Sequence, residues 1–128
     1  MKKFYLAPIV AAFWLIGVTA DSAAAGQFVP GIVDLPLMAG LVAKPESTLH
    51  YDTPSGRIVD VHASGNLNRL QVAKFYSDTL PQLGWMAMSP GVYRRDDEIL
   101  KIVIKKSETG PISVRFSLVP ASASEPVK

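Results

Sequence analysis

The clearest pattern in the chain is the alternation of apolar and polar residues in its C-terminal half. Residues 99–105 and 112–119 each carry an apolar side chain at every second position, which is typical of a strand with one buried face. Residues 85–88 and 92–95 form two shorter strand-like runs around the turn Ser89-Pro90-Gly91. The pattern predicts an antiparallel meander.

A hairpin is predicted earlier, in residues 47–63. Two β-compatible runs flank Thr53-Pro54-Ser55-Gly56, where proline at the second position and glycine at the fourth suit a type I turn. The return strand alternates between two sets that point to opposite faces, namely Val59, Val61 and Ala63 against Ile58, Asp60 and His62.

Residues 64–84 predict the one convincing helix. Asn66 or Asn68 can serve as its N-cap, and Pro81 should kink or restart its last turn. Gly84 can end the helix in the left-handed conformation, and Trp85 is placed to cover that end. We interpret this as a structural corner rather than a ligand site. The helix should present a broad apolar face made of Leu70, Val72, Ala73, Phe75, Tyr76, Leu80 and Leu83.

The order hairpin, helix, meander predicts an α+β fold in a single two-layer domain, residues 47–120. One main helix would pack on an antiparallel sheet of four to six strands in a ββαβββ-like order. The face carrying Leu100 and Phe116 would meet the helix, and the opposite face would stay in water. Residues 121–128 are small, polar and proline-bearing, and are predicted to be a disordered tail.

Residues 26–46 form an apolar arm that prolines and glycines interrupt. Its apolar side chains need cover from water, and two interpretations stay open. The arm either packs across its own domain, which we favour because large exposed apolar patches are uncommon on monomers, or it docks on a partner. The arm residues relevant to docking are Leu35, Leu37, Met38 and Leu41.

The N-terminus has the pattern of a secretory signal peptide. Lys2 and Lys3 precede the apolar residues 4–20, and Ala23-Ala24-Ala25 offers a small-residue cleavage site. We expect residues 1–25 to be removed after Ala25, which gives a periplasmic or secreted product with no membrane span. The alternative is that residues 4–20 are retained as an inner-membrane anchor.

Charge and cysteine content narrow the function classes. Lys and Arg total 13 and Asp and Glu total 11; without residues 1–25 these become 11 and 10, a net charge of about +1. This balance gives no case for nucleic acid or anionic membrane as a partner. The absence of cysteine excludes disulfides, thiolate metal sites and thiol catalysis.

Candidate chemistry gathers on the sheet face predicted to stay in water. It would present Asp60, His62, Lys101, Lys105, Arg115 and one of Arg94 or Arg95. Such a face suits an anionic ligand or an acidic partner, and the plainer alternative is a solvated face that discourages sheet pairing.

Other chemistry has little support. The only histidine besides His62 is His50, so we expect no metal and no cofactor. The acidic residues 96–98 resemble a solvated turn rather than a calcium loop. No serine lies in a nucleophile elbow, and we assign no catalytic residue.

Four stretches carry a resemblance: "DLPLMAGL", "TPSGRIVD", "FYSDTLPQLGW" and "VRFSLVP". Together they resemble a group of small exported proteins of proteobacteria, mainly alphaproteobacteria, for which no biochemical activity is assigned. The resemblance spans residues 28–120 and implies export and a compact α+β fold. It supplies no catalytic residues.

These observations predict a non-enzymatic exported accessory protein that binds another envelope protein or component. The alternative is a small anionic-ligand binder or minor enzyme that uses the cationic face. A homodimer through a free sheet edge also stays open. The residues that we expect to bind a partner or ligand are Leu35, Leu37, Met38, Leu41, Asp60, His62, Lys101 and Arg115.

Overall fold

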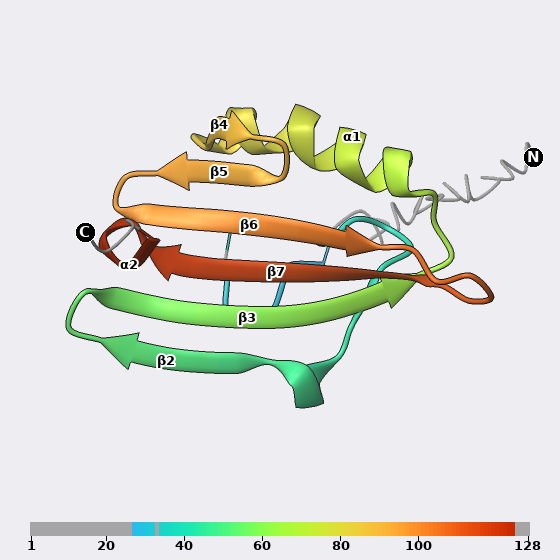
Figure 1. Cartoon of the computed structure of the whole chain (residues 1–128), viewed down its shortest axis with the longest axis horizontal. Coiled ribbons are helices and arrows are strands. Elements are labelled where there is room, and N and C mark those ends of the chain that lie inside the picture. Colours follow the sequence, from blue (N-terminus) through green and yellow to red (C-terminus); the bar gives the residue numbers. More distant parts are fainter. Residues whose placement is uncertain (1–26, 33, 125–128) are drawn as a thin grey trace, which may run out of the picture.

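An antiparallel sheet organises the chain (Figure 1). The computed structural model describes residues 27–32 and 34–124, and within them the sheet has seven strands. These are β1 (Val42–Ala43), β2 (Leu49–Thr53), β3 (Gly56–Gly65), β4 (Met86–Ser89), β5 (Val92–Arg95), β6 (Glu98–Lys105) and β7 (Ile112–Pro120). The helical elements are η2 (Pro45–Ser47), α1 (Arg69–Thr79), η3 (Leu80–Leu83) and α2 (Ala121–Ser124).

The strand order is β1-β3-β7-β6-β5-β4, and β2 also pairs with β3. β1 and β2 pair with different halves of β3, because η2 interrupts the chain between them. The predicted α+β fold is confirmed, although the sheet is larger than the four to six strands expected. β1 escaped prediction because its two residues belong to the arm, which shows no alternation.

The C-terminal segment differs from its prediction. Residues 121–128 were expected to be a disordered tail, yet Ala121–Ser124 form the short helix α2. The Ala121 amide donates a hydrogen bond to the Asp97 carbonyl (2.6 Å), and the Ala121 side chain is buried. The rest of that tail, residues 125–128, and the predicted signal peptide, residues 1–25, lie outside the described residues.

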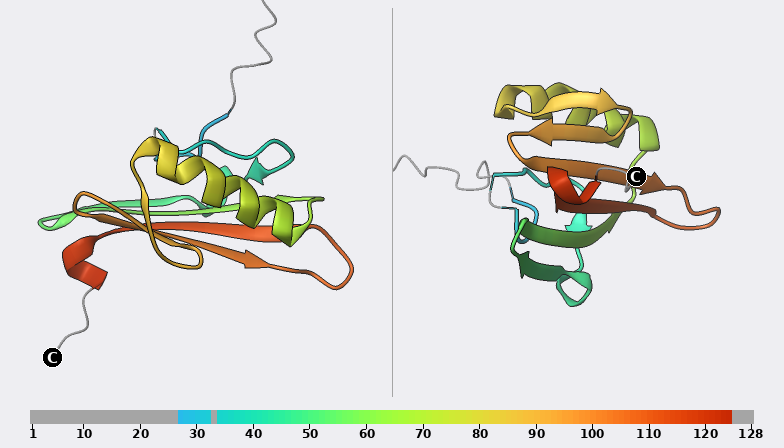
Figure 2. Two further views of the ribbon diagram at one scale, coloured as in Figure 1. Left: turned by 90° about the horizontal axis from the view of Figure 1, so that it is seen from above. Right: turned by 60° about the vertical axis from the view of Figure 1, so that its left-hand side comes forward.

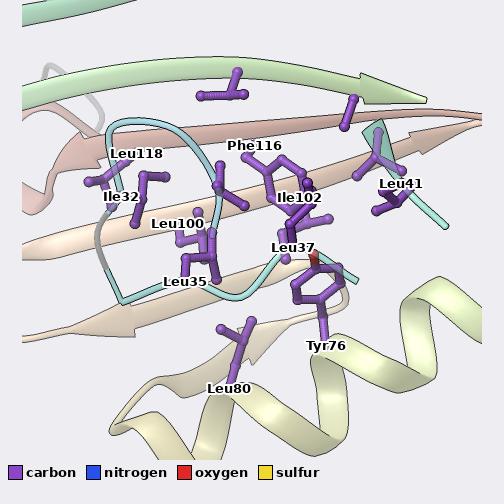
Figure 3. Close-up of a cluster of buried hydrophobic side chains, with 14 of the residues drawn as sticks. Ile32, Leu35, Leu37, Leu41, Tyr76, Leu80, Leu100, Ile102, Phe116 and Leu118 are labelled. Carbon is purple, nitrogen blue, oxygen red and sulfur yellow. The ribbon is translucent and has the colours of Figure 1, made fainter. Parts of the chain in front are cut away.

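Two pieces of the chain cover one face of the sheet, which we call the inner face. α1 lies over part of it and the N-terminal arm lies beside α1 on the same side (Figure 2). The arm packs on its own domain, the interpretation we favoured. Its buried side chains join those of the helix and sheet in one hydrophobic core (Figure 3); they are Val29, Ile32, Leu35, Leu37 and Leu41.

Tyr76 joins the helix to the arm. Its hydroxyl donates to the Pro36 carbonyl (2.9 Å) and accepts from the Met38 amide (3.1 Å). Its ring makes an edge-to-face contact with Phe116 of β7, with centroids 5.4 Å apart. Burial raises the pKa of Tyr76 to about 12, opposed in part by the Met38 hydrogen bond. One side chain thus ties helix, arm and sheet together.

The predicted broad apolar face of α1 is wrong. α1 buries only Val72 and Tyr76, and Leu80 follows at the start of η3. Leu70 is 76% exposed. The helix needs only this narrow i, i+4, i+8 stripe because the arm covers the neighbouring part of the sheet. At its start, Asn68 and Gln71 form a capping box.

The corner after α1 has the predicted structure. Pro81 lies in η3, and Gly84 adopts φ of 87° and ends the helical segment. Trp85 is 2% exposed, and the Arg95 guanidinium lies over its ring, 4.3 Å from the centroid. These contacts make the corner a packing element.

Two arginines also hold the arm to the sheet. Arg57 of β3 donates to Glu98 (2.9 Å) and to the Gly31 carbonyl (3.3 Å). Arg95 of β5 donates to the Asp34 carboxylate, and this hydrogen bond lowers the pKa of Asp34. The arm is therefore fastened by polar contacts as well as by its apolar side chains.

Gly65→Ala should destabilise the protein by about 1–3 kcal/mol, the usual cost of overpacking. A Cβ at Gly65 would lie 2.1 Å from the Gly40 carbonyl oxygen, so arm and β3 would have to separate. Denaturant unfolding measures the loss. Gly110→Ala is the control, because its Cβ would meet nothing closer than Ser107 Oγ at 3.5 Å. Equal stability of the two variants would contradict this close approach.

Tyr76→Phe should cost about 1–3 kcal/mol, because it leaves two partly buried backbone groups without their partner. It should also flatten the alkaline stability profile. A phenol whose folded-state pKa is raised stabilises the fold below its unfolded pKa, and this contribution is lost as the pH rises from about 10 to about 12.

Urea unfolding from about pH 9 to about pH 12 measures this profile. The slope that remains in Tyr76→Phe should include Tyr93, whose pKa burial also raises. The matched control is Tyr51→Phe, which removes the hydroxyl of a tyrosine that is 56% exposed. A wild-type profile that Tyr76→Phe does not alter would contradict the assignment.

Candidate functional site

The sheet face turned away from α1 and the arm, which we call the outer face, is the candidate site. Among the described residues the element lying on it is α2, at one end (Figure 2). There Ile99 is 7% exposed although it alternates with the inner-face residues of β6. Away from α2 the outer-face side chains of the central strands reach solvent.

An ion pair occupies the middle of this face. The register of β3 and β7 sets His62 opposite Arg115 and Asp60 opposite Ser117, so Arg115 reaches diagonally to Asp60. Arg115 Nε lies 3.0 Å from both Asp60 carboxylate oxygens, and its Nη2 donates to the same group. His62 Nε2 is 3.6 Å from Asp60 Oδ1.

The positive charge of Arg115 is paired with the Asp60 carboxylate. The Asp60 side chain is 17% exposed and the Arg115 side chain 52%, so the acid is held beneath the guanidinium. The hydrogen bond that Arg115 donates to Asp60 raises the pKa of Arg115. Arg115 therefore stays charged, but its partner is already supplied by the neighbouring strand.

The remaining cations of the outer face form no ion pair with a described residue. Lys101 and Lys105 are exposed, and neither makes a hydrogen bond or ion pair with a described residue. Arg94 donates to the Asp96 carbonyl in its own turn (3.3 Å). The structure resolves the choice between Arg94 and Arg95: Arg94 lies on the outer face, and Arg95 covers Trp85 on the inner side.

Exposed apolar side chains also lie on the outer face, among them Met86 of β4, and the sequence patterns did not predict them. Leu49 and Tyr51 of β2 are 50% and 56% exposed, and Val103 of β6 is 43% exposed. Leu49 lies opposite Asp60, and Tyr51 opposite Ile58. Their i, i+2 spacing in the hairpin was the signal available, but only the register connects them to the charged centre.

The arm residues proposed for docking lie elsewhere. Leu35, Leu37 and Leu41 are buried in the core, and Met38 is half-buried against it. The structure thus brings Asp60, His62, Lys101 and Arg115 to one face. It does not bring the arm residues to that face.

Neither a metal nor an enclosed small-molecule site is apparent in the described residues. His50 lies opposite Val59, so it points to the other side of the sheet from His62. No three His, Asp or Glu side chains of the described residues are placed so that they could hold a metal ion. A pocket of about 50 Å³ lies between α1, β5 and β6, far below the roughly 300–1,000 Å³ typical of ligand sites. It is lined by Ala73, Tyr76, Gly91, Tyr93, Ile102 and Ile104.

Comparison with known proteins adds no relative. No family model matches the chain, and no curated protein or solved structure matches it. The resemblance to small exported proteobacterial proteins therefore stays a prediction. Within the described residues, no helix has both the length and the apolar character needed to cross a membrane.

A double-mutant cycle with Asp60→Asn and Arg115→Gln should give a coupling free energy of about 1 kcal/mol or less. The pair is partly exposed, so water and salt screen it. Denaturant unfolding at low and high ionic strength measures the coupling, which should shrink in high salt. A coupling of several kcal/mol that salt leaves unchanged would show that the pair supports the fold.

Proposed function

We propose that the protein is a non-enzymatic, exported accessory protein that binds another protein of the cell envelope through its outer face. The carrying observation is that, apart from α2, no described element covers this face, which holds half-exposed Leu49, Tyr51 and Val103 together with Lys101 and Lys105, two lysines that pair with no described residue. Interfaces combine exposed apolar anchors with polar and charged groups in this way.

The packing of the arm supports the choice of this face. The apolar arm was the rival docking element, but its large side chains fill the core between α1 and the sheet. Releasing the arm to a partner would expose both the arm and the strands beneath it. The outer face needs no such rearrangement before it binds.

The chemistry of the face supports binding over catalysis. Asp60 is occupied by Arg115, and the His62 ring is 3.6 Å from the same carboxylate. A general base must reach a substrate proton in a site that positions the substrate. The pocket found among the described residues is lined by none of the outer-face residues, so this face offers such positioning poorly, whereas it suits a protein surface of matching shape.

The second candidate function, binding of a small anion, is favoured by one observation. Lys101 and Lys105 have no partner among the described residues, and His62 lies on the same face. Phosphate, citrate and sulfated sugars would serve as probes in a thermal-shift assay. Stabilisation that is lost in both His62→Ala and Lys101→Ala would favour this candidate.

The proposed function is tested on the full chain, tagged at its C-terminus and produced in its native cells. We expect the intact mass of the envelope fraction to begin at Gly26, as the Ala25 cleavage predicts. We also expect chemical crosslinking to recover one stoichiometric envelope protein. The charge-reversed Lys101→Glu, Lys105→Glu variant should lose it. A cytoplasmic product, or a monomer that captures nothing, would contradict the proposal.

A further inference from the structure

The outer face carries many more positive than negative charges. Its strand residues include four lysines and arginines but a single acid, which gives a net charge of +3 with His62 neutral. Residues 26–128 together carry +1, so the rest of that chain sums to −2. The five charged residues are Arg94, Lys101, Lys105, Arg115 and Asp60.

Acids near the other cations are placed on the inner side. Asp34 pairs with Arg95, and Glu98 pairs with Arg57. The single acid of the outer-face strand residues, Asp60, forms an ion pair with Arg115. Lys101 and Lys105 are thus left without a partner among the described residues, although the chain pairs arginines with acids elsewhere.

An apolar group of side chains lies at the β2 edge of the outer face, whereas the cations lie on β5, β6 and β7, where Val103 of β6 and Met86 of neighbouring β4 are also exposed. Leu49 and Tyr51 lie on β2, and the half-buried Ile58 beside Tyr51 extends this apolar region onto β3. Lys101, Lys105 and Arg94 lie on β6 and β5, across the central Asp60–Arg115 pair. A partner that fits must supply an apolar contact on one side and negative charge on the other.

We infer that the outer face binds an acidic protein surface, with Leu49 and Tyr51 as its apolar anchors and with Lys101, Lys105 and Arg94 facing carboxylates of the partner. This inference rests on the proposed function and names the chemistry of the partner. Complementary charge fixes the orientation of the partner and disfavours competitors of like charge.

Two other occupants fit less well. A second copy packed face to face would set +3 against +3, which charge complementarity opposes. An anionic membrane would attract the cations, but the exposed apolar side chains of this face are spread over β2, β4 and β6 rather than gathered on one element for insertion. Stable membrane attachment ordinarily needs a stronger combination of apolar and charged contacts.

Site-specific photocrosslinking in the native cells tests the inference. p-Benzoylphenylalanine is placed at Tyr51 or Val103 on the outer face and, as a matched exposed apolar position on α1, at Leu70. The first two positions should give a discrete adduct with a different protein, and Leu70 should not. The crosslinked peptide should contain more Asp and Glu than Lys and Arg.

Charge variants supply the second readout. Lys101→Glu with Lys105→Glu should lower the adduct yield about tenfold or more, whereas Lys101→Arg with Lys105→Arg should preserve it. Arg69→Glu with Lys74→Glu changes the net charge equally on exposed α1 positions and should leave the yield unchanged. Circular dichroism checks that every variant is folded.

Each remaining outcome counts against the inference. An adduct with this same chain, with a lipid or with a basic peptide would overturn it, as would an adduct that is insensitive to the lysine reversal. An adduct from Leu70 alone would overturn the outer-face assignment but leave an envelope protein as partner. No adduct at any of the three positions would contradict both this inference and the proposed function.

Discussion

The fold depends on the contact between the arm and α1, for which the Tyr76 hydroxyl supplies the central link. α1 is too narrow in its buried stripe to cover the sheet alone, since the helical segment fully buries only Val72, Tyr76 and Leu80, with Phe75 partly buried beside them. The arm covers the remaining strands, but its strand pairing with the sheet is that of the two-residue β1 with β3, so the rest of its proline- and glycine-interrupted backbone needs other contacts to hold it in place. The buried Tyr76 hydroxyl therefore donates to the Pro36 carbonyl and accepts from the Met38 amide, and these two hydrogen bonds hold the arm where a second helix would otherwise pack. They satisfy two backbone groups that would be costly to bury unpaired.

The two faces of the sheet therefore have different roles: the arm and α1 pack on the inner face, and the outer face is left largely exposed. The inner face is filled by the arm, by α1 and by the Arg95–Trp85 contact, with Arg57 and Arg95 closing its edge. The outer face contributes little to the core, apart from Ile99 beneath α2. Its charged residues are partly exposed, and surface ion pairs contribute only weakly to stability. The residues available for recognition are thus largely distinct from those that hold the fold together.

Sequence patterns predicted the elements whose periodicity is local. Alternation in β3, β6 and β7 assigned their faces, and Gly84 with Pro81 located the corner after α1. The structure of the arm was harder to predict, because its apolar residues follow neither the helical nor the strand period. The arm is also held by Tyr76, some 40 residues away in the sequence. Only part of the candidate site could be predicted from the sequence. Alternation placed Asp60 and His62 on one face of the sheet, but it could not predict the Asp60–Arg115 ion pair, which joins residues 55 positions apart. Such a contact depends on strand register, which follows from the tertiary packing rather than from either strand alone.

The Asp60–Arg115 pair explains why the outer face can be cationic without being uniformly repulsive. Four cations on adjacent strands would repel one another across the pleat, and a single acid at the centre neutralises the one that lies between the two outer groups of side chains. What remains is Lys101 and Lys105 to one side and Leu49 with Tyr51 to the other. The lysine stems can lie along the sheet while their ammonium groups stay hydrated, so the isolated protein tolerates them. The two ammonium groups would contribute to specific binding only when a carboxylate replaces that water. Because no described residue supplies this carboxylate, a partner would have to provide it.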